Sequence, residues 1–183
     1  MTGWYLIALG SNRRGRAGSP ADQLRKALTE INGVLRVSPI VASAPVGPSI
    51  RRFANAVALV ESGLTPPAML AHLKTIERRL GRRRGRRWGA RPIDLDLIGW
   101  SSGTWQSPTL TIPHPRFRER AFVLGPLLAI APDWHDPVTG RTVRQLLARL
   151  TAPRPMPSCG CAGASRSALL VRVRSSVGRA SDF

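Results

Sequence analysis

Apolar residues along this chain gather in short runs that predict β-strands. These runs are rich in Val, Ile, Leu, Thr or Trp and are bounded by Gly, Pro and Ser, as strands and their turns commonly are. They cover residues 4–9, 34–43, 55–61, 94–100 and 109–112.

Between these runs, apolar residues recur every three or four positions, which predicts two amphipathic helices. The first is expected to begin after Ser19 as N-cap, with Pro20 at its first position and Asp22 in its first turn. The second is expected to begin after Thr65, which is also followed by proline, and to stop at Gly81. The apolar stripes are Ala21, Leu24, Leu28 and Ile31 in the first helix, and Leu70, Leu73, Ile76 and Leu80 in the second.

The order of these elements predicts an α+β fold with a ferredoxin-like antiparallel sheet. Strand, helix, strand, strand, helix, strand is the split βαβ arrangement, in which both helices cover one face of the sheet. A third apolar segment at residues 121–132 and a short helix at 142–150 could cover the other face, giving a three-layer αβα domain. We therefore predict a domain at residues 1–150. Residues 151–183 contain Pro, Gly and Ser throughout and are expected to form a poorly ordered basic tail.

Composition narrows the class of protein. A chain of 183 residues suggests one domain, and it contains no run of about 18 apolar residues that would predict a membrane span. The opening GWYLIALG has no basic residue ahead of it and is short for a signal peptide. Cys159 and Cys161 have no nearby histidine to complete a zinc site, so reduced thiols are expected. These features predict a cytoplasmic location and no membrane partner.

The formal net charge of +18 would ordinarily suggest a nucleic-acid partner. Six arginines lie between Arg82 and Arg91, however, and only Lys26 and Lys74 are lysines, a bias that genome composition can produce. An RNA-binding module on the same sheet is the first alternative. It would need aromatic residues exposed on adjacent strands, and strand motifs of the RGF type with paired aromatics are missing. We therefore expect no nucleic-acid partner.

Asp94 and Asp96 form the first candidate site. Side chains two residues apart on a strand share a face, so both carboxylates would project together. Like charges at that distance repel unless a cation lies between them, and few hard oxygen ligands suit Mg²⁺, which takes its other ligands from water and phosphate. The alternative is that one aspartate caps a turn while the other pairs with an arginine.

The arginine-rich loop before these aspartates suits polyphosphate, because guanidinium groups bind phosphate oxygens with two parallel hydrogen bonds. Its simpler interpretation is a solvated turn after a helix. A Walker-type G-x-x-x-x-G-K-[ST] motif is absent, so arginine and metal would have to hold the phosphates of any bound ATP. His114 lies between prolines at a strand exit near Arg116, Arg118 and Arg120. It is either a phosphate contact or a surface turn residue.

Four ordered motifs carry a family resemblance. ALGSN, SAPVG with FANAVAL, RWGARPIDLDLI and IPHPRFRERAFVLGPL occur in the same order and spacing as in 6-hydroxymethyl-7,8-dihydropterin pyrophosphokinases of folate biosynthesis. The resemblance covers roughly residues 4–150. It implies an enzyme that moves the terminal pyrophosphate of ATP onto the hydroxymethyl group of the reduced pterin and releases AMP. A monomer with these two small-molecule substrates is expected.

The resemblance also implies roles for individual residues. Asp94 and Asp96 would bind two magnesium ions, and Asp96 could orient or deprotonate the attacking hydroxyl. Arg82 and Arg91 would stabilise charge on the transferring group. The residues implied in ATP binding are Glu77, Arg84, Trp88, Ile98, Thr111, His114 and Arg120.

The pterin would stack between Phe53 and Phe122 and hydrogen-bond Asn55. A flat heterocycle gains from two aromatic faces, and an amide offers both a donor and an acceptor. Plain core packing is the other interpretation of the two phenylalanines. Backbone contacts with the pterin are implied around Ser43, Ala44 and Val46.

The chain departs from the family pattern at several positions. Lys74 and Thr109 stand where many members have Gln and Arg that help to hold ATP, and Ala90 replaces a usual proline. These changes bear on nucleotide affinity more than on reaction type. A second alternative to the enzyme is an inactive structural homologue whose motifs persist for folding. Asp94→Ala and Asp96→Ala variants discriminate: activity should collapse with the fold intact if the carboxylates hold metal, whereas RNA binding should hardly change.

Overall fold

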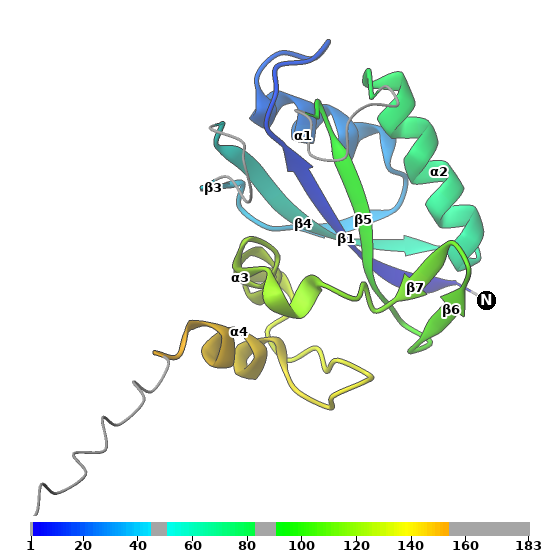
Figure 1. Cartoon of the computed structure of the whole chain (residues 1–183). Helices are drawn as coiled ribbons and strands as arrows, with labels where there is room; N and C mark the ends of the chain where they lie inside the picture. Colours follow the sequence, from blue (N-terminus) through cyan, green and yellow to red (C-terminus); the bar gives the residue numbers. More distant parts are fainter. Residues whose placement is uncertain (1, 45–50, 83–90, 154–183) are drawn as a thin grey trace, which may run out of the picture. The chain divides into compact units, whose positions relative to one another are not determined.

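The structure, a computed structural model, describes residues 2–44, 51–82 and 91–153 (Figure 1). Met1–Ala152 form one compact unit. The predicted tail at 151–183 lies outside the described residues from position 154 onward, so its predicted disorder stays a prediction. No described helix is long and apolar enough to span a membrane.

The main sheet is antiparallel and has β1 (Gly3–Ser11) at its centre. β1 pairs on one side with β4 (Phe53–Ser62) and on the other with β5 (Asp94–Trp100). β2 (Val34–Val37) and β3 (Val41–Ser43) both pair with β4, and the strand order is β2-β4-β1-β5. This order confirms the predicted ferredoxin-like arrangement.

The predicted single strand at 34–43 is wrong in detail, because the chain leaves the ladder between β2 and β3. Ser38 donates its backbone N–H to the Val57 carbonyl, and its hydroxyl accepts the Val57 N–H, both at 2.9 Å. Pro39 follows and has no N–H to continue the pairing. Ser38 therefore pairs with both backbone polar groups of Val57 where the strand pairing is interrupted.

A short strand was also missed in the sequence. β6 (Trp105–Ser107) pairs with β7 (Leu110–Ile112) in a separate two-stranded sheet. The turn between them is closed by Ser107, whose hydroxyl accepts the Leu110 N–H at 3.1 Å. Three residues give too little alternation to predict a strand from sequence.

The two predicted helices are confirmed as α1 (Pro20–Glu30) and α2 (Pro66–Arg79). Ser19 and Asp22 form a reciprocal capping box at the start of α1. α2 ends before Gly81, which has a φ of +94°, a backbone conformation that glycine adopts without a Cβ penalty. Both helices cover the same face of the sheet (Figure 1).

The other face carries α3 (Ala121–Ile130) and α4 (Val143–Thr151), as the sequence predicted (Figure 1). The alternation along β1 shows the layers directly, since Ile7 packs towards α1 and α2 whereas Leu6 packs towards α3 and α4. Each fully buried Leu or Ile contributes about 1.5–3 kcal/mol relative to an exposed one. The two apolar clusters therefore hold the sheet between two helical layers.

Candidate active site

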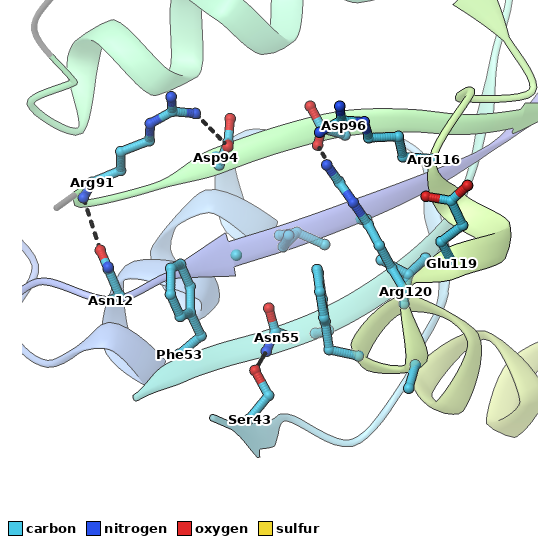
Figure 2. Close-up of a pocket in the computed structure, with 17 residues that line it drawn as sticks. Asn12, Ser43, Phe53, Asn55, Arg91, Asp94, Asp96, Arg116, Glu119 and Arg120 are labelled. Carbon is cyan, nitrogen blue, oxygen red and sulfur yellow. Dashed lines mark hydrogen bonds and ion pairs between the residues drawn. The ribbon is translucent and has the colours of Figure 1, made fainter. Parts of the chain in front are cut away.

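A pocket of about 740 Å³ opens at one end of the sheet, between the strands and the start of α3 (Figure 2). Its lining combines carboxylates, guanidinium groups and aromatic rings from β3, β4, β5 and the segment before α3. Eight of the site residues predicted from the sequence line it: Ser43, Phe53, Asn55, Arg91, Asp94, Asp96, Arg120 and Phe122.

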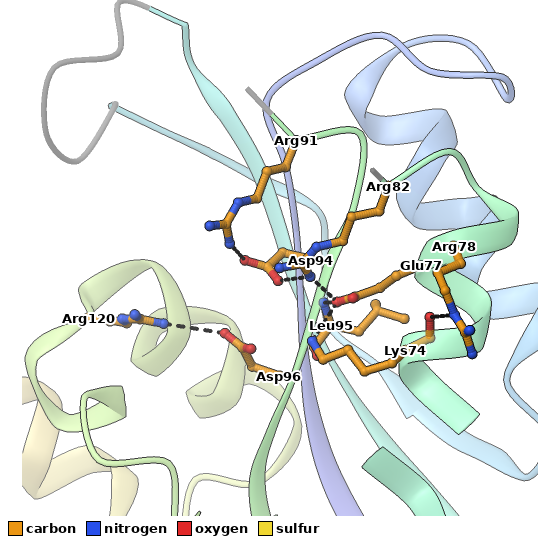
Figure 3. Close-up of polar contacts among 9 residues, drawn as sticks. All are labelled: Lys74, Glu77, Arg78, Arg82, Arg91, Asp94, Leu95, Asp96 and Arg120. Carbon is orange, nitrogen blue, oxygen red and sulfur yellow. Dashed lines mark hydrogen bonds and ion pairs between the residues drawn. The ribbon is translucent and has the colours of Figure 1, made fainter. Parts of the chain in front are cut away.

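Asp94 and Asp96 lie on the same side of β5 and line the pocket, as their spacing predicted (Figure 3). Their side chains are 31% and 30% exposed, whereas the intervening Leu95 is buried on the opposite face. The strand therefore presents two carboxylates to one cavity.

Arginines neutralise both carboxylates (Figure 3). Asp94 accepts from Arg82 and from Arg91, the latter at 2.9 Å between Nη1 and Oδ2. Asp96 lies 3.5 Å from Arg120 Nη1. Burial alone would raise the pKa of Asp94, but the charges of Arg82, Lys74 and Arg91 outweigh it and lower that pKa. Asp94 is therefore ionised at neutral pH.

The donor set fits magnesium only in the presence of phosphate. Among the residues that the structure describes, no group of three or more His, Cys, Asp and Glu side chains could hold a metal ion. Magnesium commonly binds proteins through one or two carboxylates and completes its octahedron with substrate phosphates and water. Asp94 and Asp96 match that pattern.

Glu77 lies on the opposite side of β5 from the pocket, in the interface with α2 (Figure 3). It is 1% exposed and accepts the Leu95 N–H at 2.7 Å and the Lys74 ammonium at 2.9 Å, as well as the Arg82 guanidinium. Burial raises its pKa despite these two cations. The predicted contact between Glu77 and adenosine stays a prediction, since the structure shows its carboxylate engaged inside the protein.

Three further predicted nucleotide residues that the structure describes do not line this pocket. Ile98 is buried under α3, Thr111 is exposed on β7, and His114 follows β7. The His114 N–H donates to the Ile98 carbonyl at 3.1 Å, and its Nδ1 accepts the Arg116 N–H at 3.1 Å. Burial lowers the pKa of His114, so at neutral pH its ring is uncharged and carries its proton on Nε2.

Among the other predicted residues, one is described and three are not. Ala44 is exposed at the end of β3 and does not line the pocket. Val46, Arg84 and Trp88 lie outside the described residues, as do most positions of the arginine-rich loop.

The aromatic part of the pocket is formed by Phe53 from β4, which Figure 2 labels, and by Phe122 from α3. Both rings are half-buried, and Phe122 also packs against the core, while the Arg120 guanidinium lies 5.8 Å from its centroid. Asn55 is 4% exposed and donates its amide to the Ser43 hydroxyl at 2.8 Å. This bond fixes the amide orientation and leaves the carbonyl oxygen able to accept from a ligand.

Three polar or charged lining residues were not among the site residues predicted from the sequence: Asn12, Arg116 and Glu119. Asn12 ends the ALGSN motif, and its side-chain oxygen accepts the Arg91 N–H at 2.8 Å. Asn12 is part of a family motif, but its type alone did not indicate a site residue, because asparagine is also common in the turns that follow strands.

An ion pair that the sequence did not reveal anchors the short 3₁₀ helix η1 (Phe117–Glu119), which comes directly before Arg120. Arg118 binds the buried Asp136 through both Nε and Nη2, at 2.7 and 2.6 Å. Thr139 and the Val138 N–H also donate to this carboxylate. The network ties η1, and with it one wall of the pocket, to the segment before α4.

The Asp136 network predicts a specific acid sensitivity. Burial alone would raise the pKa of Asp136, but the bonds from Arg118, Thr139 and Val138 lower it overall. A carboxyl with a lowered pKa in the folded state stabilises the fold above its unfolded pKa of about 3.9 and loses that contribution as the pH falls. We expect Asp136→Asn to be less stable than the parent at pH 7, and the gap to narrow below about pH 4. Denaturant unfolding at both pH values measures this, and a gap that does not change with pH would contradict it.

The ferredoxin-like sheet and this pocket, with paired carboxylates, convergent arginines and an aromatic wall, define a class: transferases that bind a polyphosphate beside a flat acceptor. Residues 6–132 match the family described as 7,8-dihydro-6-hydroxymethylpterin-pyrophosphokinase (HPPK). The chain belongs to this family.

Curated relatives support the assignment over most of the chain. A 2-amino-4-hydroxy-6-hydroxymethyldihydropteridine pyrophosphokinase of Synechocystis sp. is 37% identical over 157 residues, covering 83% of this chain and 78% of that protein. The protein of the same name from Pseudomonas aeruginosa is 38% identical over 148 residues, covering 78% of this chain and 88% of its own.

Solved structures agree in fold. A crystal structure of Plasmodium falciparum HPPK-DHPS matches with a TM-score of 0.65 at 15% identity, covering 81% of this chain and 45% of that chain. This chain thus spans less than half of the Plasmodium protein. At this identity the likeness concerns the fold alone.

Proposed function

We propose that this ATP-dependent pyrophosphokinase of folate biosynthesis transfers the terminal pyrophosphate of ATP to the hydroxymethyl group of 6-hydroxymethyl-7,8-dihydropterin, releasing AMP, at the pocket described above. The observation that carries the proposal is the pair Asp94 and Asp96, which open from one strand onto a cavity lined by both arginine and phenylalanine. Charge neutralisation and positioning, the main requirements of phosphoryl-type transfer, are thereby brought to one place.

Asp94 and Asp96 are the residues that would hold two magnesium ions. When bound, magnesium neutralises phosphate charge and orients the reacting oxygens. Arg82, Arg91 and Arg120 compensate the charge of the two carboxylates in the structure. Phosphate oxygens would compete for these guanidinium groups, so nucleotide binding exchanges arginine–carboxylate pairs for arginine–phosphate pairs.

The arginines at the pocket are proposed to have two different roles. Arg82 and Arg91 flank Asp94 and would stabilise negative charge as the pyrophosphoryl group leaves AMP. Arg120, which lies at Asp96, would hold the nucleotide phosphates together with His114. Further nucleotide contacts are proposed at Glu77, Arg84, Trp88, Ile98 and Thr111.

The pterin is proposed to bind against the aromatic wall. Phe53 and Phe122 would stack on its two faces, and the Asn55 carbonyl would accept from the edge of its ring. Backbone contacts around Ser43, Ala44 and Val46 would complete the site. Asp96, the carboxylate facing Arg120, would orient or deprotonate the attacking hydroxyl.

The wider setting of the enzyme is likewise proposed. The catalytic domain comprises residues 1–150, and the basic tail at 151–183 is dispensable for turnover. The protein acts as a cytoplasmic monomer on its two small-molecule substrates, without a nucleic-acid partner.

The function is tested by a chromatographic assay with ATP, Mg²⁺ and 6-hydroxymethyl-7,8-dihydropterin. AMP accumulating in step with a pterin pyrophosphate is the expected result. ADP as the product would indicate transfer of a single phosphoryl group instead. An absence of nucleotide products would support the inactive homologue, and binding of RNA by that inactive chain would support the nucleic-acid alternative.

A further inference from the structure

The ALGSN motif ends in a side chain that the proposed mechanism does not use. Asn12 follows the last residue of β1, is 4% exposed and lines the pocket (Figure 2). A buried amide must find hydrogen-bond partners, because leaving one unpaired costs about 1–3 kcal/mol. Its partner therefore indicates what the side chain does.

That partner is the backbone of Arg91. Asn12 Oδ1 accepts the Arg91 N–H at 2.8 Å, and the Asn12 N–H donates to the Arg91 carbonyl at 3.3 Å. One asparagine thus binds both backbone polar groups of one arginine. The two bonds fix where the Arg91 backbone lies relative to the end of β1.

The sequence explains why a side chain is needed here. β1 and β5 are paired as far as Gly10 and Asp94, and two further steps along that register bring Asn12 opposite Pro92. Proline has no N–H and cannot continue the ladder. The Asn12 carboxamide accepts the N–H of the preceding residue, Arg91, and so extends the contact between the two chain segments past the proline.

The anchored residue is itself in contact with the candidate metal site. Arg91 Nη1 donates to Asp94 Oδ2 at 2.9 Å, and Asp94 lies three residues further along the chain (Figures 2 and 3). Because the Arg91 backbone is bound to Asn12, the range of positions that its guanidinium can reach beside the Asp94 carboxylate is restricted. A shift of about 1 Å in such a group can cost about a hundredfold in rate.

We infer that Asn12 is a positioning residue for pyrophosphoryl transfer, which acts by holding the Arg91 backbone so that its guanidinium meets the transferring group. The inference rests on the proposed role of Arg91. It assigns Asn12 no contact with the substrate. Its effect on turnover therefore passes through Arg91, and that dependence can be measured.

A double-mutant cycle tests the dependence. Four proteins are compared, the parent, Asn12→Ala, Arg91→Ala and the double variant, by kcat and by KM for ATP at saturating pterin and Mg²⁺. Asn12→Ala is expected to lower kcat between about tenfold and a hundredfold. In the Arg91→Ala background the same change is expected to have little further effect, because two residues that act through one contact are not additive.

Two further variants separate positioning from folding. Asn12→Asp keeps the size and the acceptor oxygen and is expected to stay close to the parent in kcat. Asn32→Ala removes an exposed asparagine at the turn after α1 and should leave both kcat and Tm unchanged. Tm is recorded for every variant.

The outcomes are distinct. Additive losses in the double variant would overturn the inference, as would an Asn12→Ala protein with normal kcat. If Arg91→Ala has a normal kcat, the proposed role of Arg91 is wrong, and the inference on Asn12, which rests on it, is overturned with it. If Asn12→Ala loses activity and Asn12→Asp does not recover it, the amide has another role than accepting the Arg91 N–H.

Discussion

Replacing Asp94 or Asp96 with alanine is expected to lower kcat by about a thousandfold or more while the domain stays folded. Each carboxylate lies at the pocket, about a third exposed, so its removal opens no cavity in the core. Without Asp94, Arg82 and Arg91 lose the carboxylate that they share, and without Asp96, Arg120 loses its partner. In either case the proposed magnesium ions would lose a ligand. Several kcal/mol of stabilisation at the reacting centre would be lost, and each 1.36 kcal/mol is a factor of ten in rate.

The measurement is single-turnover AMP formation at saturating ATP and Mg²⁺, with Tm recorded in parallel. Asp133→Ala, which removes an exposed aspartate after α3, is the matched control and should match the parent in both. Asp94→Asn and Asp96→Asn keep the side-chain shape and remove the charge, so they should be as slow as the alanine variants. Turnover within tenfold of the parent in Asp96→Ala would show that this carboxylate does not hold the metal.

Replacing Glu77 with alanine is expected to have the largest effect on stability, a loss of about 3–5 kcal/mol in the free energy of unfolding. The change leaves the Leu95 N–H without an acceptor in the interface between β5 and α2. It also leaves Lys74 and Arg82 without the buried anion that both contact. Breaking one side of a buried ionic network costs more than the pair contributes. Arg82 keeps its pair with Asp94, so the cost falls mainly on the buried Leu95 N–H and on Lys74.

For a domain of this size the loss corresponds to a fall in Tm on the order of 10 °C, measured by thermal unfolding and checked with urea. Glu61→Ala, at an exposed position on β4, serves as the control and should change Tm little. Glu77→Gln retains an acceptor for Leu95 and should fall between the two. A Glu77→Ala protein that keeps its Tm but binds ATP weakly would instead favour the predicted contact with adenosine.

Much of the fold follows from local chemistry that can be seen in the sequence. Ser19 with Pro20, and Thr65 with Pro66, predict both helix starts, since proline at the first position and a small polar residue before it act within one turn. The division of 34–43 into two strands was not predicted, because it depends on Ser38 pairing with Val57 across the sheet. Pro39 marks a possible end of the pairing in the sequence, but nothing local shows that Ser38 pairs with Val57.

The same distinction applies to the site. Asp94 and Asp96 could be predicted because their spacing alone places them on one face of a strand. Arg118 could not be paired with Asp136, nor Asn12 with Arg91, because both contacts join segments that only the folded sheet and helices bring together. In a sequence with so many arginines, the sequence alone does not indicate which guanidinium forms a buried ion pair.

The helices on the two faces of the sheet differ in how freely their surface residues can be substituted. Among the described residues, those that line the pocket come from strands, η1, α3 and the segments next to them, and none comes from α1. The outward side of α1 can therefore accumulate substitutions under selection for packing and solubility alone. Libraries meant to raise expression or thermal tolerance are best directed there, whereas changes around η1 and α3 would also change the lining of the pocket.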